Sequence, residues 1–274
     1  MALRIGTNVA AIGASRNLNK TSQEMQQSLE RLASGSRITQ PGEDAAGFAI
    51  SERLRGQERG LAQARLNADN AIGLIQVAEG GLQEQNNIVV RLREIAVQSA
   101  SDTVSDTERE FLDTEFQTLV KESDRIAKST RFGQKQLLVG TKENFDFFVG
   151  TSGDRETDVI NYQLAADTTS SLGLSGLGVA DQGDAQDALS DLDDSLTKLA
   201  EARAGFGAIQ GRLEIAGSNL DTQRVNVSEA RSRISDTDIA QEATNLARAQ
   251  VLQDMGVAVL AQANQMPARA LKLL

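Results

Sequence analysis

The stretch that decides the fold is residues 192–234, LDDSLTKLAEARAGFGAIQGRLEIAGSNLDTQRVNVSEARSRI. A large apolar side chain returns at every seventh position, at Leu192, Leu199, Phe206, Leu213, Leu220, Val227 and Ile234. A seven-residue period keeps one stripe of an α-helix on one side and is typical of helices that supercoil around a partner. At 1.5 Å per residue the stretch predicts a rod about 64 Å long. Such a rod needs a partner helix of similar length to cover its stripe.

A matching stripe earlier in the chain provides that partner. From Ile50 to Ala96 the spacing again alternates between three and four residues, through Leu54, Gln57, Leu61, Ala64, Ala68, Ala71, Ile75, Ala78, Leu82, Gln85, Val89 and Leu92. Two such stripes, one early and one late, predict a mainly α fold, a long-helix coiled-coil bundle in which the chain folds back on itself. We expect the stripe residues themselves to form the core of this bundle.

Both ends of the chain continue the helical pattern and predict paired terminal helical arms. The first arm carries so little charge beside its apolar face that a protein partner is favoured over a membrane. The spacing of three and four persists to the end of the chain, although chain ends normally fray. We expect each arm to cover the other first, and neighbouring copies of the chain second. The candidate packing residues are Ile5, Val9, Ile12, Leu18, Met25, Leu29 and Leu32 in the first arm and Leu246, Leu252, Met255, Val259, Met266 and Leu273 in the last.

Turn residues and changes of pattern divide the chain further. Pro41 follows the first arm, and a capping-box pattern at Ser105–Glu108 or Thr107–Glu110 predicts the start of a separate helix. Two runs of alternating apolar and polar residues then predict a small β-hairpin, followed by a connector rich in Ser and Gly. The predicted division is an N-terminal arm at 1–41, long bundle helices at 42–138, the hairpin and connector at 139–184, a long return helix at 185–234 and a C-terminal arm at 235–274.

The composition argues against several classes of function. The 274 residues include no Cys and no His, which leaves no disulfide, no soft-metal site and none of the commonest general base. A net charge of −10 argues against a nucleic-acid partner. No apolar run reaches the length of a membrane span, and no apolar leader predicts a cleaved secretory signal. We therefore expect no catalytic, cofactor-binding or metal-binding residue and no membrane insertion.

Two glycine clusters resemble phosphate-binding loops only in their glycines. Gly173, Gly176 and Gly178 have no Lys-Ser or Lys-Thr pair after them, which favours a flexible turn. Gly205 and Gly207 lie inside the heptad stretch and not after a strand. Neither cluster predicts a nucleotide site.

Five blocks along nearly the whole chain together resemble the bacterial flagellins. Within the first block, Asp44–Ala45–Ala46–Gly47 is the most specific part. Two departures stand out: the unusual Gln40–Pro41–Gly42–Glu43 segment before it, and a variable outer domain that is almost absent. The blocks, in order, are Leu29–Leu54, Leu92–Ala100, Ser123–Leu138, Ser228–Glu242 and Val259–Leu274.

The resemblance implies a structural subunit that polymerises with itself into the flagellar filament for motility. In the family the paired arms form an inner tube, and the long helices and hairpin form an outer one. The resemblance also implies export of the unfolded chain by the flagellar type III apparatus. The partners it implies are a flagellar export chaperone, the filament cap and the hook-junction proteins. We expect a secreted, extracellular filament, and a periplasmic filament stays open as an alternative.

The resemblance further implies a surface for the vertebrate innate receptor that binds flagellin. The matching residues are Arg91, Ile95 and Glu115. Subunit contacts within a filament explain all three equally well. For Ile95, which precedes the stripe residue Ala96, a second packing layer is the better explanation.

Other classes of protein compete with the flagellin hypothesis. A hook–filament junction protein has similar ends, but the unbroken match at both ends and the short middle favour flagellin. An enzyme would have to work with carboxylates, Ser and Lys alone, because His and Cys are missing. An adhesin or a soluble coiled-coil interaction protein would be an isolated monomer with helical arms.

Overall fold

A computed structural model describes residues 7–140, 144–163 and 166–271 of the chain. Long helices and two small antiparallel sheets make up the described structure, which confirms the mainly α prediction. The residues cluster into two compact units, Arg59–Arg224 and a second unit that joins Met1–Glu58 to Val225–Leu274. The packing candidates Ile5 and Leu273 lie outside the described residues.

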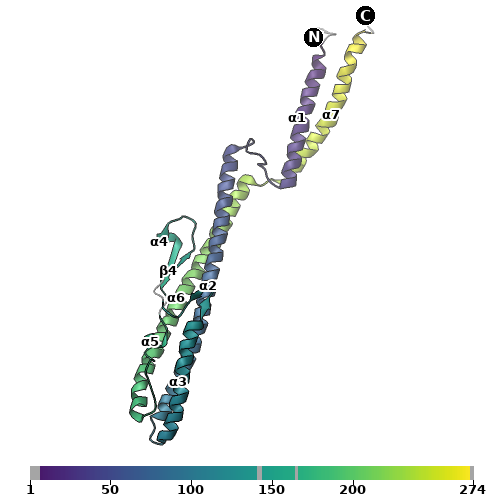
Figure 1. Cartoon of the computed structure of the whole chain (residues 1–274). Helices are drawn as coiled ribbons and strands as arrows, with labels where there is room; N and C mark the ends of the chain where they lie inside the picture. The colour runs from purple at the N-terminus through teal and green to yellow at the C-terminus, as the bar shows by residue number, and fades with distance from the viewer. Residues whose placement is uncertain (1–6, 141–143, 164–165, 272–274) are drawn as a thin grey trace. The chain divides into compact units, whose positions relative to one another are not determined.

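Two antiparallel helices, α2 (Ala45–Ser99) and α6 (Gln182–Ser235), run through the unit Arg59–Arg224 (Figure 1). As residue numbers rise along α2, those of its partners on α6 fall. This is the folded-back pairing that the two stripes predict. Ion pairs at 3.0, 3.6 and 2.7 Å show this direction, at Arg65–Asp221, Glu79–Arg203 and Arg93–Asp193.

The two stripes form the core of this unit. Gln223, three residues after Leu220 on the α6 stripe, is an exception because it is exposed. Exposure of a polar side chain costs little free energy. Within this unit the seven-residue pattern therefore identified the buried face of each helix. Outside the unit, Ile50 and Gln57 on the α2 stripe are exposed, and Val227 and Ile234 on the α6 stripe are half-buried. The buried apolar side chains include Leu61, Ala64, Ala68, Ile75, Ala78, Leu82, Val89, Leu92 and Ala96 on α2, and Leu192, Leu199, Phe206, Ile209, Leu213 and Leu220 on α6.

A third helix, α3 (Asp106–Ser129), begins where the capping-box pattern predicts. The carboxylate of Glu108 accepts hydrogen bonds from the backbone N–H and the hydroxyl of Ser105, both at 2.8 Å. These bonds lower the pKa of Glu108. Arg109, on the first turn of α3, is buried and donates to the carbonyl oxygens of Ser99 and Ser101 at the end of α2. Arg109 therefore satisfies carbonyl groups that a helix C-terminus leaves without a partner in the helix.

The predicted β-hairpin is present and consists of β3 (Asn144–Phe148) and β4 (Val159–Gln163). The strands are antiparallel, with Phe145 opposite Tyr162. The loop between them contains the short helix α4 (Arg155–Asp158). The ring of Tyr162 lies 5.6 Å from that of Phe206 on α6, so the hairpin packs on the bundle.

The sequence did not predict two short elements beside this hairpin. A second hairpin pairs β1 (Arg131–Phe132) with β2 (Lys135–Gln136). The helix α5 (Thr169–Leu172) follows β4. These elements are only two to four residues long, which is too short for a period of 2 or 3.6 residues to show in the sequence.

The arms are two antiparallel helices, α1 (Val9–Ser34) and α7 (Ile239–Leu271), which lie side by side (Figure 1). Asn8 begins α1: its side-chain oxygen accepts from the N–H of Ala11, and its amide group donates to the carbonyl oxygen of Ala263 at 2.8 Å. Gly35 ends α1 in the left-handed conformation, φ 70°. The arms are therefore paired, as predicted.

Hydrogen bonds also join the segments that connect the arms to the long helices. The N–H of Arg37 donates to the carbonyl oxygen of Ser235 at 2.6 Å, and the N–H of Thr237 donates to that of Gly35 at 2.9 Å. Glu43 stabilises the segment between α1 and α2, because its carboxylate accepts a hydrogen bond from the N–H of Thr39 at 3.0 Å. It also accepts from the Arg31 guanidinium at 3.3 Å. The bond from Thr39 and then the charge of Arg31 hold the pKa of Glu43 below its ordinary value.

The core predicts that Leu92→Ala destabilises the bundle by about 2–5 kcal/mol, because it removes a fully buried side chain and leaves a cavity. The matched control is Val90→Ala on the same helix, where the native side chain is 42% exposed. Urea unfolding followed by circular dichroism gives both free energies of unfolding. Equal losses in the two variants would contradict the predicted core.

The connecting segment predicts that Glu43→Gln exposes the chain around Arg37 to trypsin at neutral pH. The lowered pKa keeps the Glu43 carboxylate charged there, so its stabilising contacts are present at pH 7 and are lost only on acidification through that pKa. The initial rate of cleavage after Arg37 is the measurement. Glu52→Gln, which removes only an exposed pair with Arg55 on the same helix, is the control. Identical cleavage rates in wild type and Glu43→Gln would rule out this role of Glu43.

Candidate functional site

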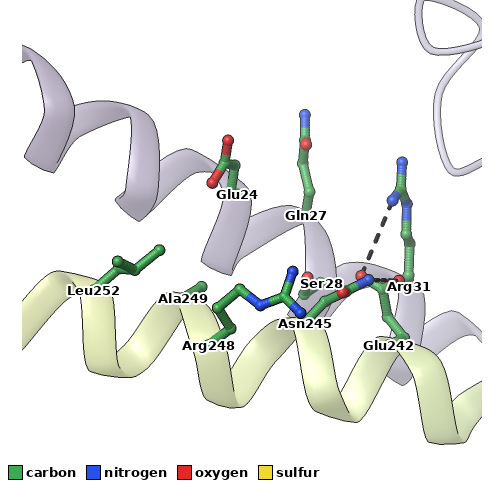
Figure 2. Close-up of a pocket in the computed structure, with 9 residues that line it drawn as sticks. All are labelled: Glu24, Gln27, Ser28, Arg31, Glu242, Asn245, Arg248, Ala249 and Leu252. Carbon is green, nitrogen blue, oxygen red and sulfur yellow. Dashed lines mark hydrogen bonds and ion pairs between the residues drawn. The ribbon is translucent and has the colours of Figure 1, made fainter.

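The arm pair encloses a polar hollow of about 230 Å³ between α1 and α7 (Figure 2). Arg31 lies 3.3 Å from Glu43 and 4.0 Å from Glu242, and Asn245 donates to Glu242 at 3.3 Å. Arg31 thus joins α1 both to α7 and to the segment before α2. The lining residues are Glu24, Gln27, Ser28, Arg31, Glu242, Asn245, Arg248, Ala249 and Leu252.

The described parts of the chain give no indication of a metal site or of a membrane-spanning helix. Within residues 7–140, 144–163 and 166–271, no three acidic, His or Cys side chains gather as metal ligands would. In the same residues no helix has both the length and the apolar character of a membrane span. The surfaces of the helices are therefore the candidates for function.

The two arms meet along a seam of small and polar residues. Glu242, Ala249 and Ala263 are buried on the face of α7 toward α1, and Gly256 occupies the position seven residues after Ala249. A Cβ atom on Gly256 would lie 3.1 Å from the Leu18 side chain of α1, tighter than ordinary contact. Small side chains at seven-residue spacing let the helix backbones approach closely. Gly256 could not be placed in this seam from apolar periodicity, because glycine has no side chain that marks a buried face.

The candidate packing residues divide into two groups. Leu18, Met25, Leu32 and Leu246 are half-buried, as expected of residues beside the seam. The other described candidates are exposed although they are large and apolar: Val9, Ile12 and Leu29 on α1, and Leu252, Met255, Val259 and Met266 on α7. We call these seven residues the outer arm stripe. Within one copy of the chain the arm pair leaves this stripe uncovered.

The residues matched to the innate-receptor surface do not all lie on a surface. Arg91 and Glu115 are exposed and paired, with Arg91 Nη2 2.8 Å and Nε 3.1 Å from Glu115 Oε1. Arg91 also pairs with Glu94 on its own helix at 2.9 Å. Ile95 is 0% exposed, so its assignment to this surface is wrong for the folded chain. It forms the second packing layer that its place beside the stripe indicated.

The glycine clusters have packing roles. Gly173 and Gly176 adopt positive φ angles of 85° and 84°, and the connector around them is anchored by the buried Leu172 and Leu174. Gly205 makes room for the hairpin, because a Cβ atom there would lie 2.8 Å from the hydroxyl oxygen of Tyr162. This contact explains the glycine at position 205 in an otherwise regular helical pattern.

Comparison with protein families gives two matches that together cover most of the chain. Residues 5–143 match the bacterial flagellin N-terminal helical region, and residues 189–274 match the C-terminal helical region. The short middle between the matches agrees with the predicted lack of a variable outer domain.

Curated relatives are similar over almost their whole length. A flagellin of Halalkalibacterium halodurans is 40% identical and is aligned over 98% of this chain and 99% of its own. The flagellar filament 33 kDa core protein of Treponema phagedenis is 37% identical over the same shares. A flagellin of Bacillus subtilis is 34% identical, over 99% of this chain and 100% of its own.

Solved structures agree with the fold. The crystal structure of Bacillus cereus flagellin superposes with a TM-score of 0.51 at 25% identity and covers 61% of this chain and 94% of that one. A putative flagellar hook-associated protein of Vibrio parahaemolyticus shares the fold at 14% identity, with a TM-score of 0.61 over 71% of this chain and 100% of that one. Flagellins are structural proteins of the filament, which confirms the prediction of a protein that is not an enzyme. The chain belongs to the family of bacterial flagellins, as a short form with almost no variable outer domain.

Proposed function

We propose that the chain polymerises into a flagellar filament through its two arms, with the outer arm stripe as the main contact between copies. One observation carries the proposal: seven large apolar side chains remain in solvent after the arms have covered each other. Burial of apolar surface in a neighbouring copy removes it from water at about 25 cal/mol per Å². The stripe therefore supplies a driving force for polymerisation that a single copy leaves unused.

We further propose that the chain leaves the cell unfolded, through the flagellar type III apparatus. The lack of Cys supports this route, since no disulfide hinders threading. Before export, an uncovered apolar stripe favours capture by an export chaperone. After export, the filament cap and the hook-junction proteins are the partners at the two ends of the polymer. These partners follow from membership of the family.

Electron microscopy of the purified chain separates the two flagellar roles. A filament subunit forms long tubes by itself, whereas a hook–filament junction protein does not. The proposal places the filament outside the cell, with the periplasm as the alternative. Immunogold labelling of intact cells decides between them, because an antibody reaches only the external filament.

The outer arm stripe predicts that Leu252→Asp blocks filament growth. Leu252 is 45% exposed, so the substitution leaves the folded monomer intact but places a charge where a neighbouring copy must bury it. An unpaired buried charge costs several kcal/mol. Sedimentation and electron microscopy measure growth, and circular dichroism checks the monomer.

The matched control for this prediction is Gln250→Asp, an equally acidic change at an exposed polar position two residues away on α7. Normal filaments are expected from the control. Normal filaments from Leu252→Asp as well would contradict a contact at this stripe.

The pair Arg91–Glu115 predicts binding of the vertebrate innate receptor by monomer and not by filament, because assembly covers the same face. Charge-assisted hydrogen bonds from the exposed Arg91 are the expected contact. Arg91→Ala and Glu115→Ala should each weaken binding of monomer in surface plasmon resonance. Arg125→Ala, which breaks only an exposed pair with Glu122 within α3, is the control. If wild-type monomer does not bind, the assignment of this surface from the family is wrong.

A further inference from the structure

Three polar side chains are buried together inside the bundle. Gln85 on α2 and Ser123 on α3 are 0% exposed, and Asp167, between β4 and α5, is 3% exposed. The amide group of Gln85 connects them: Nε2 donates to the carbonyl oxygen of Asp167 at 2.8 Å and to that of Ser123 at 3.3 Å. We call these three residues the buried polar cluster.

Three side-chain oxygens of the buried polar cluster lack a hydrogen-bond partner. Both hydrogens of the Gln85 amide are used by the two carbonyl oxygens. Gln85 Oε1, Ser123 Oγ and Asp167 Oδ2 are buried without a hydrogen-bond partner among the described residues. An ionised Asp167 carboxylate offers only acceptors, as does Gln85 Oε1, whereas a protonated carboxyl group supplies one O–H donor. An ionised Asp167 would therefore be a buried charge with no hydrogen bond at Oδ2.

The backbone on both sides prevents Asp167 from turning away from the cluster. The N–H of Asp167 donates to the carbonyl oxygen of Leu138 at 2.9 Å, and Ala166 pairs with Val139 in an isolated β-bridge. The chain lies so close here that a Cβ atom on Gly140 would be 2.1 Å from the Cβ of Ala166. These contacts hold the backbone of the segment in place, so the carboxyl group starts from a buried position.

The charged groups of the surrounding elements have partners of their own. Asp124, next to Ser123 on α3, pairs with Lys128 and accepts from Thr169 at 3.2 Å. Arg203 on α6 pairs with Glu79 on α2 at 3.6 Å. Glu84, next to Gln85 on α2, is exposed.

Burial changes the pKa values of Asp167 and of its neighbour Tyr162. Tyr162 on β4 has its pKa raised by burial and then by the charge of Asp167. Burial raises the pKa of Asp167 to about 6 from the ordinary value of 3.8. No Arg or Lys among the described residues forms an ion pair with Asp167 that would offset this burial.

We propose that Asp167 is a proton-operated latch of the bundle: the segment 166–168 stays packed on α2 while this buried carboxyl group is protonated, and ionisation of the group loosens the segment. In the loosened state the carboxyl group regains its ordinary affinity for the proton. The latch is therefore at full strength below pH 3.8, weakens as the pH rises through about 6 and is constant above that. Over this range the opening constant of the segment rises about a hundredfold. The latch acts in a single copy of the chain and does not depend on assembly.

The first test is the titration of the carboxyl group in wild-type monomer. Aspartate labelled with ¹³C at the carboxyl carbon is followed by NMR from pH 3 to 8, and the Asp167 signal is assigned through its link to Thr168. A midpoint near pH 6 is expected. A midpoint below pH 5 would overturn the proposal, and this result needs no variant to fold.

The second test compares amide hydrogen exchange at residue 167 in wild type and Asp167→Asn between pH 4 and 7, corrected for intrinsic exchange rates. The opening constant of wild type should rise about a hundredfold and that of Asp167→Asn should stay level. Asp187→Asn, the same change at an exposed position on α6, is the control and should behave as wild type. An equal rise in wild type and Asp167→Asn would exclude Asp167 as the latch.

Discussion

The close contact of α2 with α6 along their seven-residue stripes is the interaction on which the unit Arg59–Arg224 depends. Leu, Ile and Ala fill it, with Phe206 as the one aromatic side chain of the α6 stripe, so the helices approach closely. The hairpin and α3 pack on this pair of helices. Tyr162 contacts Gly205 and Phe206, and Arg109 donates a hydrogen bond to a carbonyl oxygen at the end of α2. Each of these additions satisfies backbone or aromatic groups that the helix pair alone would leave uncovered.

The arms use the same seven-residue periodicity, but with small residues in the contact between the helices. Their shared seam carries Ala249, Gly256 and Ala263, whereas larger residues such as Leu252 and Val259 stay about half exposed beside it. Because the seam between α1 and α7 holds small side chains, the contact buries little apolar area. The larger apolar side chains of the outer arm stripe remain on the surface of the arm pair. That distribution suits a subunit that must stay soluble as a monomer and still gain stability when copies join, because the larger apolar gain is reserved for the polymer.

Much of the fold could be predicted because seven-residue periodicity is a long-range signal. It identified the buried faces of α2 and α6, and the Ser105–Glu108 pattern located the start of α3. Gly256 in the arm seam could not be identified in this way because glycine carries no hydrophobic signal, whereas the place of Ile95 beside the stripe correctly indicated a second packing layer. The buried polar cluster also could not be predicted from the sequence. Gln85 is a single polar residue in an apolar stripe, and Asp167 comes next to it only in the folded chain.

The most direct test of the account is a cryo-electron-microscopy structure of filaments grown from the purified chain. The account predicts that the outer arm stripe, with Val9 and Ile12 on α1 and Leu252 and Val259 on α7, is buried against the arms of neighbouring copies. Filaments in which these four side chains face solvent, with the copies joined through other surfaces, would contradict it.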